Sequence, residues 1–166
     1  MKKTALITGA TSGIGKTTAI RFAQEGIRIV LCGRQENILD KLKVELSAHT
    51  DVYTICFDVR DKLKVESEIE LLPPEFSKID VLINNAGNAH GLDPIQSGSS
   101  EDWEAMLDIN VKGLLNVSKP IISKMIEQKS GHIINIGSTA GKEVYPNGNV
   151  YCASKHAVDA LNQGMR

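Results

Sequence analysis

The chain has 166 residues, of which 42% are hydrophobic and 23% charged, which is typical of one globular domain with a hydrophobic core. Its formal net charge of -1 leaves no basic surplus, so we expect neither nucleic acid nor a membrane as a partner. Few apolar residues separate Lys3 from Gly9, too few for a signal peptide or a spanning helix, and a cytoplasmic location is expected.

A glycine-rich turn between a strand and a helix begins the predicted elements. Thr4 to Ile7 is a short apolar run, and apolar residues at helical spacing predict a helix from Gly15 to Gly26, where the glycine suits a helix end. Between them lies T-G-A-T-S-G-I-G, residues 8–15. Glycines allow close approach to the main chain, and free N–H groups at a helix start suit a phosphate.

Two nucleotide motifs compete for this turn. The phosphate loop of nucleotide triphosphatases, G-x-x-x-x-G-K-[ST], would need a glycine where the chain has Ala10. The dinucleotide fingerprint G-x-G-x-x-G does not fit either, because the glycines at 9, 13 and 15 give G-x-x-x-G-x-G.

Strands and helices then alternate. The pattern predicts a buried strand over Ile27–Cys32, an amphipathic helix over Glu36–Leu46 and a third strand over Val52–Phe57. A charged helix over Lys62–Leu72 follows, and Ile79–Ile83 reads as a fourth strand. This order predicts an α/β fold with a doubly wound parallel sheet, a Rossmann fold with helices on both faces.

Cys32, Cys56 and Cys152 are odd in number and widely spaced, so they indicate neither a disulfide framework nor a zinc site, and no metal is expected. Cys32 and Cys56 are expected to be small buried core residues.

The end of the second strand bears on the cofactor. An acidic residue about 20 positions after the glycines binds the ribose 2'-hydroxyl in dinucleotide folds, whereas an arginine there pairs with a 2'-phosphate. Arg34 therefore favours NADP(H), although Glu36 nearby leaves NAD(H) open.

The second half is predicted to contain one long helix, one strand and a final helix. Glu101–Met125 is apolar around much of its circumference and should be widely buried, with Pro120 kinking or dividing it. His132–Ile136 predicts the fifth strand, and Tyr151–Arg166 the last helix.

Polar motifs follow two of these strands. Asn84-Asn85-Ala86-Gly87 ends the fourth, and small residues there let a ribose come close. Ser138 follows the fifth, thirteen residues before Tyr151, and Tyr-x-x-x-Lys places Tyr151 and Lys155 on one helical face.

The glycine spacing, N-N-A-G, a helix asparagine, the serine and Y-x-x-x-K, in this order, resemble the short-chain dehydrogenase/reductase family over the whole chain. The resemblance implies a catalytic group of Asn110, Ser138, Tyr151 and Lys155, with Asn110 holding a water for proton relay. Asp58 and Val59 would lie against the adenine. The implied cofactor-binding residues are Gly9, Thr11, Ser12, Gly13, Ile14, Gly15, Gly33, Arg34, Asp58, Val59, Asn85, Ala86, Gly87, Tyr151 and Lys155.

The residue types suit hydride transfer, which leaves an alkoxide that needs a proton. Tyrosine has a reference pKa of about 10, so it catalyses poorly near neutrality unless a nearby cation favours the tyrosinate. Lys155 lies one turn away and supplies such a charge, while Ser138 would orient the substrate oxygen.

Residues 85–92, 101–104, 131–141 and 145–151 look like the NADP-dependent 3-hydroxy acid and serine dehydrogenases. The resemblance implies oxidation of a short 3-hydroxy acid such as serine or allo-threonine. Three alternatives stay open: a reductase of a different carbonyl substrate, an NADP(H)-sensing module without turnover, and a phosphate-loop nucleotide triphosphatase.

The predicted final helix ends at Arg166 without a cap signal or a following strand. Because the doubly wound plan includes a sixth strand, we expect residues 1–166 to be a single NAD(P)-binding domain that lacks the C-terminal part of the family fold. In the resembling family that part also forms some of the subunit interface, so the full-length protein is expected to be a homo-oligomer, a dimer or tetramer.

Overall fold

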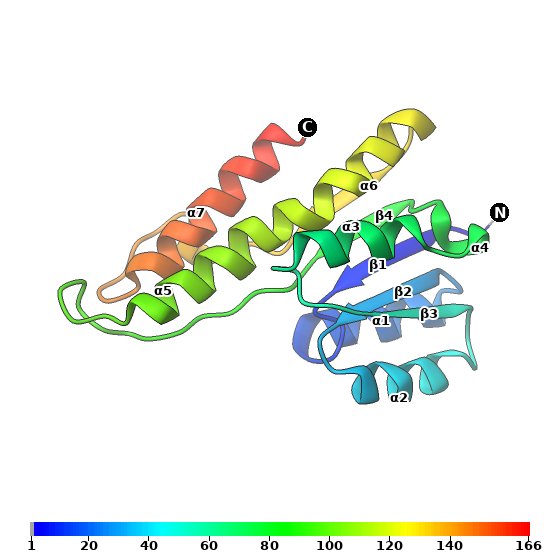
Figure 1. Ribbon diagram of the computed structural model, residues 1–166, viewed down its shortest axis with the longest axis horizontal. Helices are drawn as coiled ribbons and strands as arrows, with labels where there is room; N and C mark the ends of the chain where they lie inside the picture. Colours follow the sequence, from blue (N-terminus) through cyan, green and yellow to red (C-terminus); the bar gives the residue numbers. More distant parts are fainter. Residues whose placement is uncertain (1) are drawn as a thin grey trace.

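Five parallel strands form one sheet in the order β3-β2-β1-β4-β5 in the computed structural model, which describes residues 2–166 (Figure 1). Ile7 in β1 pairs with Leu31 in β2 and with Ile83 in β4, so β1 lies at the centre. The chain moves outward from β1 to β3 and then returns to β4 on the other side, which confirms the doubly wound sheet. The strands are Thr4–Thr8, Arg28–Gly33, Val52–Cys56, Val81–Asn84 and His132–Asn135.

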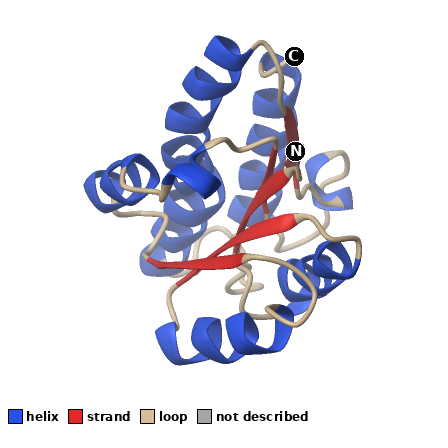
Figure 2. Cartoon of the chain, turned by 90° about the vertical axis from the view of Figure 1, so that its right-hand side faces the viewer, coloured by secondary structure: helices blue, strands red, loops and turns tan. Residues whose placement is uncertain are grey.

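Helices cover both faces of this sheet (Figure 2). The helices α1 (Gly13–Gln24) and α2 (Glu36–Leu46) pack on one face, and α3 (Lys62–Glu70) and α6 (Leu114–Gln128) supply the other core. Since successive strand residues point to opposite faces, each strand contributes to two hydrophobic cores. One contains Leu6, Val30 and Leu82, and the other contains Ile7, Ile29, Leu31 and Ile83. This burial on both faces explains the nearly continuous apolar runs.

Helix α1 ends as the sequence predicts. Gly26 has a positive φ of 73°, a conformation that glycine adopts without a steric cost. Its N–H donates to the Ala23 carbonyl, and the Ile27 N–H donates to the Phe22 carbonyl. This pair of bonds is the Schellman arrangement, which satisfies carbonyls at the helix end and turns the chain into β2.

The structure differs from the prediction around the middle of the chain. A short helix, α4 (Pro74–Ser77), was not predicted; it begins on Pro74, whose missing N–H costs nothing at a first helical position. The prediction that both Cys32 and Cys56 are buried is wrong for Cys56, which is exposed, whereas Cys32 is buried. Cys56 ends β3, the edge strand, where cover from neighbouring elements is incomplete.

The long helix is divided, but not at Pro120. Helix α5 (Ser100–Leu107), a π-helical segment η1 (Asp108–Gly113) and α6 follow one another along one long arm of the molecule (Figure 1). Pro120 lies inside α6, which continues through it because Val117 and Ile121, both fully buried, hold the helix in the core. The interruption is the π-helix instead, and such segments are frequent at functional sites.

A short 3-10 turn, η2 (Thr139–Gly141), connects β5 to the last helix, α7 (Asn149–Gly164). Helix α7 packs against α5 and η1, so the chain's final helix returns to the carboxyl edge of the sheet. Among residues 2–166, none of the helices has both the length and the apolar character to cross a membrane.

Candidate active site

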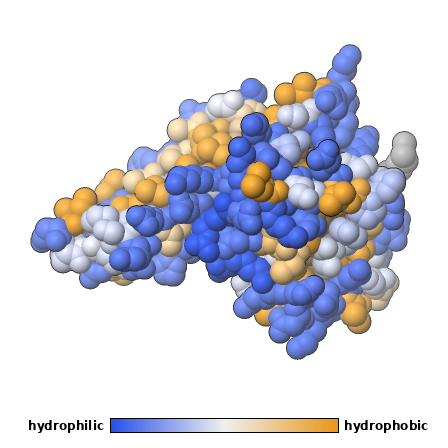
Figure 3. All heavy atoms as spheres, in the orientation of Figure 1, coloured by the Kyte–Doolittle hydropathy of each residue, from blue (hydrophilic) through white to orange (hydrophobic). Residues whose placement is uncertain are grey.

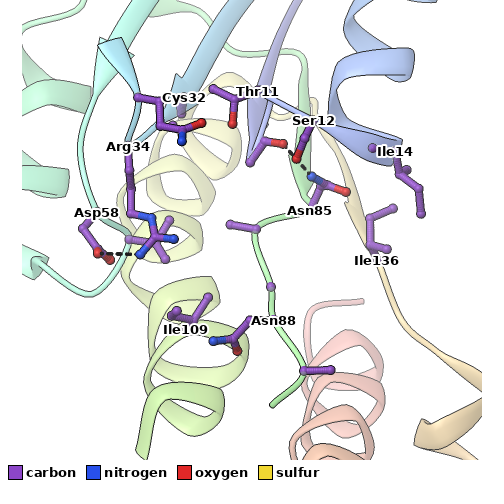
Figure 4. Close-up of a pocket in the computed structure, with 18 of the residues that line it drawn as sticks. Thr11, Ser12, Ile14, Cys32, Arg34, Asp58, Asn85, Asn88, Ile109 and Ile136 are labelled. Carbon is purple, nitrogen blue, oxygen red and sulfur yellow. Dashed lines mark hydrogen bonds and ion pairs between the residues drawn. The ribbon is translucent and has the colours of Figure 1, made fainter. Parts of the chain in front are cut away.

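A cleft of about 890 Å³ lies at the carboxyl edge of the sheet, where the chain reverses between β1 and β4 (Figure 4). Ligands of open α/β sheets bind in this crevice. Most of the residues singled out in the sequence line it: Gly9, Thr11, Ser12, Gly13, Ile14, Gly33, Arg34, Asp58, Val59, Asn85, Ala86, Gly87, Tyr151 and Lys155. The strand ends therefore bring these distant residues together.

Three of the sequence-predicted residues are not in the lining. Gly15 is buried behind the glycine turn, Asn110 is buried in η1, and Ser138 directly precedes η2. Eight lining residues were missed: Cys32, Gln35, Phe57, Asn88, Ala89, Ile109, Ile136 and Gly137. All but Ile109 lie within two residues of a predicted residue at or after a strand end, so the topology itself was their signal.

The glycine turn presents its main chain to the cleft. Gly9 and Gly13 have φ values of 62° and 51°, and a Cβ added at Gly13 would meet no atom within 4 Å. Ser12 precedes α1 without capping it through its side chain, so the first N–H groups of the helix are left for another acceptor. Such a helix start fits an anionic pyrophosphate.

Hydrogen bonds join this turn to the end of β4. The Asn85 Nδ2 donates to the Thr8 carbonyl at 2.9 Å and to the Gly9 carbonyl at 3.1 Å. The backbone N–H groups of Asn85 and Ala86 both donate to the Thr8 Oγ1 at 3.0 Å. These bonds fix the two walls of the cleft relative to each other.

Charged groups stand at the end of the cleft that lies after β2 and β3. Figure 4 shows Arg34 and Asp58 facing each other, with the Arg34 Nη1 3.6 Å from the Asp58 Oδ2. Hydrogen bonds from Arg60 to Asp58 hold the pKa of that carboxyl below its usual value. Asp58 is therefore a carboxylate near neutral pH, and Arg34 is the cation nearest to it within the lining.

Tyr151 and Lys155 lie one helical turn apart on α7, as predicted. The Lys155 Nζ is 6.0 Å from the centre of the Tyr151 ring, and it donates to the Ile136 carbonyl at 2.8 Å. Burial lowers the pKa of Lys155. The Ser138 Oγ accepts a bond of 3.1 Å from the Ala140 N–H, so this hydroxyl is held at the start of η2.

Asn110 ties three parts of the site together. Its Oδ1 accepts from the Asn88 N–H at 2.8 Å, and its Nδ2 donates to the Asn88 carbonyl at 2.9 Å and to the Ser154 Oγ at 3.1 Å. The loop after β4, the π-helix and α7 therefore meet at one buried amide. The predicted water-holding role of Asn110 remains a prediction.

The sequence matches the family described as short chain dehydrogenase over residues 3–166. The chain belongs to the short-chain dehydrogenase family.

Relatives of this short-chain dehydrogenase carry several names. It is 44% identical over 161 residues to the NADP-dependent 3-hydroxy acid dehydrogenase YdfG of Escherichia coli O6:H1, covering 97% of this chain and 64% of the relative. It is 43% identical to sulfoacetaldehyde reductase 2 of Chromohalobacter salexigens, covering 100% and 66%. The short-chain dehydrogenase described here thus spans less than two thirds of the length of these curated relatives.

Solved structures of this fold are similar as well. The closed form of serine dehydrogenase complexed with NADP+ superposes with a TM-score of 0.93 at 42% identity, covering 98% of this chain and 65% of the other. An NAD+-bound xylitol dehydrogenase gives a TM-score of 0.93 at 35% identity, covering 98% and 63%. Both nicotinamide cofactors therefore occur among the structural relatives of this short-chain dehydrogenase.

Proposed function

We propose that residues 1–166 form a dinucleotide-binding domain that takes NADP(H) and serves hydride transfer between the nicotinamide and a secondary alcohol or carbonyl. One observation carries the proposal: a single cleft joins the glycine turn and Arg34 at one end to Tyr151 and Lys155 at the other. A dinucleotide has an anionic centre and two distant rings, and this cleft offers a phosphate-binding helix start between two walls.

The outer end of the cleft also supports a cofactor that carries a 2'-phosphate. The Arg34 side chain lines the cleft and is 64% exposed, so a ribose 2'-phosphate bound there would meet its guanidinium. No acidic side chain replaces it at the end of β2, since Gly33 and Arg34 are followed by Gln35. This arrangement favours NADP(H) over NAD(H).

Tyr151 and Lys155 on α7 would carry out the proton transfer. When bound, the nicotinamide supplies or accepts the hydride. In the reducing direction, the Tyr151 hydroxyl gives its proton to the substrate oxygen as the carbonyl carbon receives the hydride, and in the oxidising direction it takes the proton back. Lys155 is fixed by the Ile136 carbonyl beside the Tyr151 ring. Ser138 orients the substrate oxygen.

Relatives suggest the substrate class. Two similar proteins are named as a 3-hydroxy acid dehydrogenase and a sulfoacetaldehyde reductase, and the substrates in both names carry an acidic group. We infer that the substrate is a short 3-hydroxy acid such as serine or allo-threonine, with a small carbonyl compound of another type as the alternative.

A second function, NADP(H) binding without turnover, is favoured by one feature. Ser138 lies outside the cleft lining and its Oγ is engaged by the Ala140 N–H. A hydroxyl outside the lining that already accepts a backbone bond is less suited to orienting a substrate oxygen than one that lines the cleft.

The full-length protein is proposed to be a homo-oligomer. Leu107 and Leu115 on α5 and α6 are each 40% exposed, and Figure 3 shows hydrophobic atoms along the arm that these helices form. Light scattering after size exclusion tests this point, and a strictly monomeric full-length protein would contradict it.

Fluorescence titration of the chain with NADPH and NADH tests the cofactor, with ATP as a competitor. We expect tighter binding of NADPH and no displacement by ATP at equal concentration; ATP hydrolysis by the chain would instead support a phosphate-loop enzyme. Following NADPH formation from NADP+ with serine, allo-threonine and 3-hydroxypropionate then separates an enzyme from a sensor.

A further inference from the structure

Arg60, which no motif singled out, forms a forked ion pair with Asp58 in the turn between β3 and α3. Its Nε donates to the Asp58 Oδ1 at 3.1 Å, and its Nη2 donates to the Asp58 Oδ2 at 2.8 Å. The Arg60 backbone N–H adds a bond of 3.0 Å to the Oδ1. Both carboxylate oxygens are therefore engaged in charge-assisted hydrogen bonds, whose paired geometry fixes direction as well as distance.

Arg34 approaches the same carboxylate without bonding to it. Its Nη1 is 3.6 Å from the Asp58 Oδ2, beyond hydrogen-bonding distance. Among residues 2–166, Asp58 is the ion-pair partner of the Arg34 guanidinium, and no protein atom accepts a hydrogen bond from it. Figure 4 shows this guanidinium beside Asp58 and within the cleft, so its donors are available to a ligand.

The three charged residues differ in whether they line the cleft. Arg34 and Asp58 line the cleft, whereas Arg60 does not. Together they carry one net positive charge next to the place where a 2'-phosphate would lie. Without the Arg60 side chain the pair would be neutral. The Asp58 Oδ1 would keep only the bond from the backbone N–H of residue 60, and the Oδ2, which faces Arg34, would have no partner.

We propose that Arg60 is a specificity-determining positioning residue: by engaging Asp58, it keeps Arg34 free to bind the 2'-phosphate of NADP(H). The inference rests on the proposed function, in which the cofactor is NADP(H). Removing the Arg60 side chain lets Asp58 capture Arg34 in its place, and a 2'-phosphate must then compete with a carboxylate for the same guanidinium. Arg60 thus acts on the cofactor through Asp58 and Arg34 rather than by contact.

Two simpler roles for Arg60 predict different experimental results. A purely structural role in the β3–α3 turn would disturb the whole adenylate end of the cleft. A direct long-range attraction of the phosphate would persist whether or not position 58 carries a charge. The proposed role alone requires that the effect of losing Arg60 disappear when Asp58 is neutral.

Calorimetric titration with adenosine 2',5'-bisphosphate and with 5'-AMP tests these roles, because the two probes differ only in the 2'-phosphate. The proteins are the unaltered chain, Arg60→Ala, Asp58→Asn and the double variant. The matched control is Arg21→Ala, since Arg21 is an exposed arginine paired with Glu25 far from the cleft. Thermal melts of every variant check folding.

For Arg60→Ala we expect bisphosphate binding to weaken about tenfold, with 5'-AMP changed by less than about twofold. In the double variant, the ratio of the bisphosphate affinity to the 5'-AMP affinity should return to within about threefold of the ratio in the unaltered chain, because an asparagine cannot capture Arg34 electrostatically. The ratio is compared because Asp58 itself lines the cleft, so that its replacement affects both probes. Arg21→Ala should change neither affinity.

An unchanged bisphosphate affinity in Arg60→Ala would overturn the inference. So would an equal loss of affinity for both probes, or a double variant with the same ratio of bisphosphate to 5'-AMP affinity as Arg60→Ala. An unaltered chain that binds both probes equally would instead refute the proposed NADP(H) preference itself. Failure of the inference and failure of the proposed function therefore give different results.

Discussion

Replacing Gly15 with alanine tests how closely the glycine turn and β4 approach each other. A Cβ at this position would lie 3.0 Å from the Gly9 carbonyl carbon and closer still to the Gly9 oxygen and the Asn85 Nδ2. Two of these three atoms belong to backbone at the end of a central strand. Gly9 directly follows Thr8, the last β1 residue that pairs with β2, so a shift of the Gly9 carbonyl strains the end of that strand.

The expected loss of stability is the sum of three contributions. Overpacking a tight site costs about 1–3 kcal/mol, and displacing Asn85 from the Thr8 and Gly9 carbonyls adds about 1 kcal/mol. Alanine favours the helix by about 1 kcal/mol over glycine, which offsets part of the loss. We expect a net destabilisation of about 1–3 kcal/mol for Gly15→Ala, or a melting temperature lowered by roughly 2–12 °C.

Differential scanning calorimetry measures this loss, and NADPH titration measures its effect on the site. Since the start of α1 must shift, NADPH binding should weaken by about tenfold or more. Gly164→Ala is the matched control, because a Cβ there meets no atom within 4 Å at the end of α7. A melting temperature for Gly15→Ala within about 2 °C of the unaltered chain would refute the close approach that we describe.

Three further substitutions address the chemistry. Tyr151→Phe should abolish NADP-linked turnover while NADPH binding, followed by fluorescence, stays within about twofold, since only the proton path is lost; substantial turnover would refute its role. Arg34→Asp should reverse the preference toward NADH in the same titration, and an unchanged preference would make Arg34 a surface charge. Burial lowers the pKa of Lys155, so between this lowered pKa and the unfolded value of about 10.4 the unfolded chain binds more protons, and stability should rise with pH over that window. Urea melts of Lys155→Met should lack this rise.

Much of the fold follows from the sequence because local signals and topology agree. The predicted helix over Glu36–Leu46 has the observed bounds of α2, and its buried face is Leu39, Leu42 and Leu46. Gly26 ends α1 because the reversal needs a positive φ. Strand ends shift by one or two residues, since a run of apolar residues does not show where ladder hydrogen bonds stop.

The division of the long helix could not be predicted in the same way. Proline is a visible signal, yet α6 continues through Pro120 because burial of Val117 and Ile121 offsets one missing hydrogen bond. The π-helix at Asp108–Gly113 has no comparable residue signal. It depends on tertiary contacts, among them the bonds of Asn110 to Asn88 and Ser154.

The candidate site, like the fold, could be predicted from the sequence only in part. Residues that follow strands could be assigned to the cleft from the sequence, because a parallel sheet gathers its carboxyl ends at one edge. The pairing of charges at that edge could not be predicted. Asp58 and Arg60 are two residues apart, and nothing in the sequence pattern shows that their side chains bond to each other while Arg34, which follows β2, lies next to Asp58. The sequence thus predicts which residues meet, whereas side-chain geometry decides which guanidinium is occupied by the protein and which is left for a ligand.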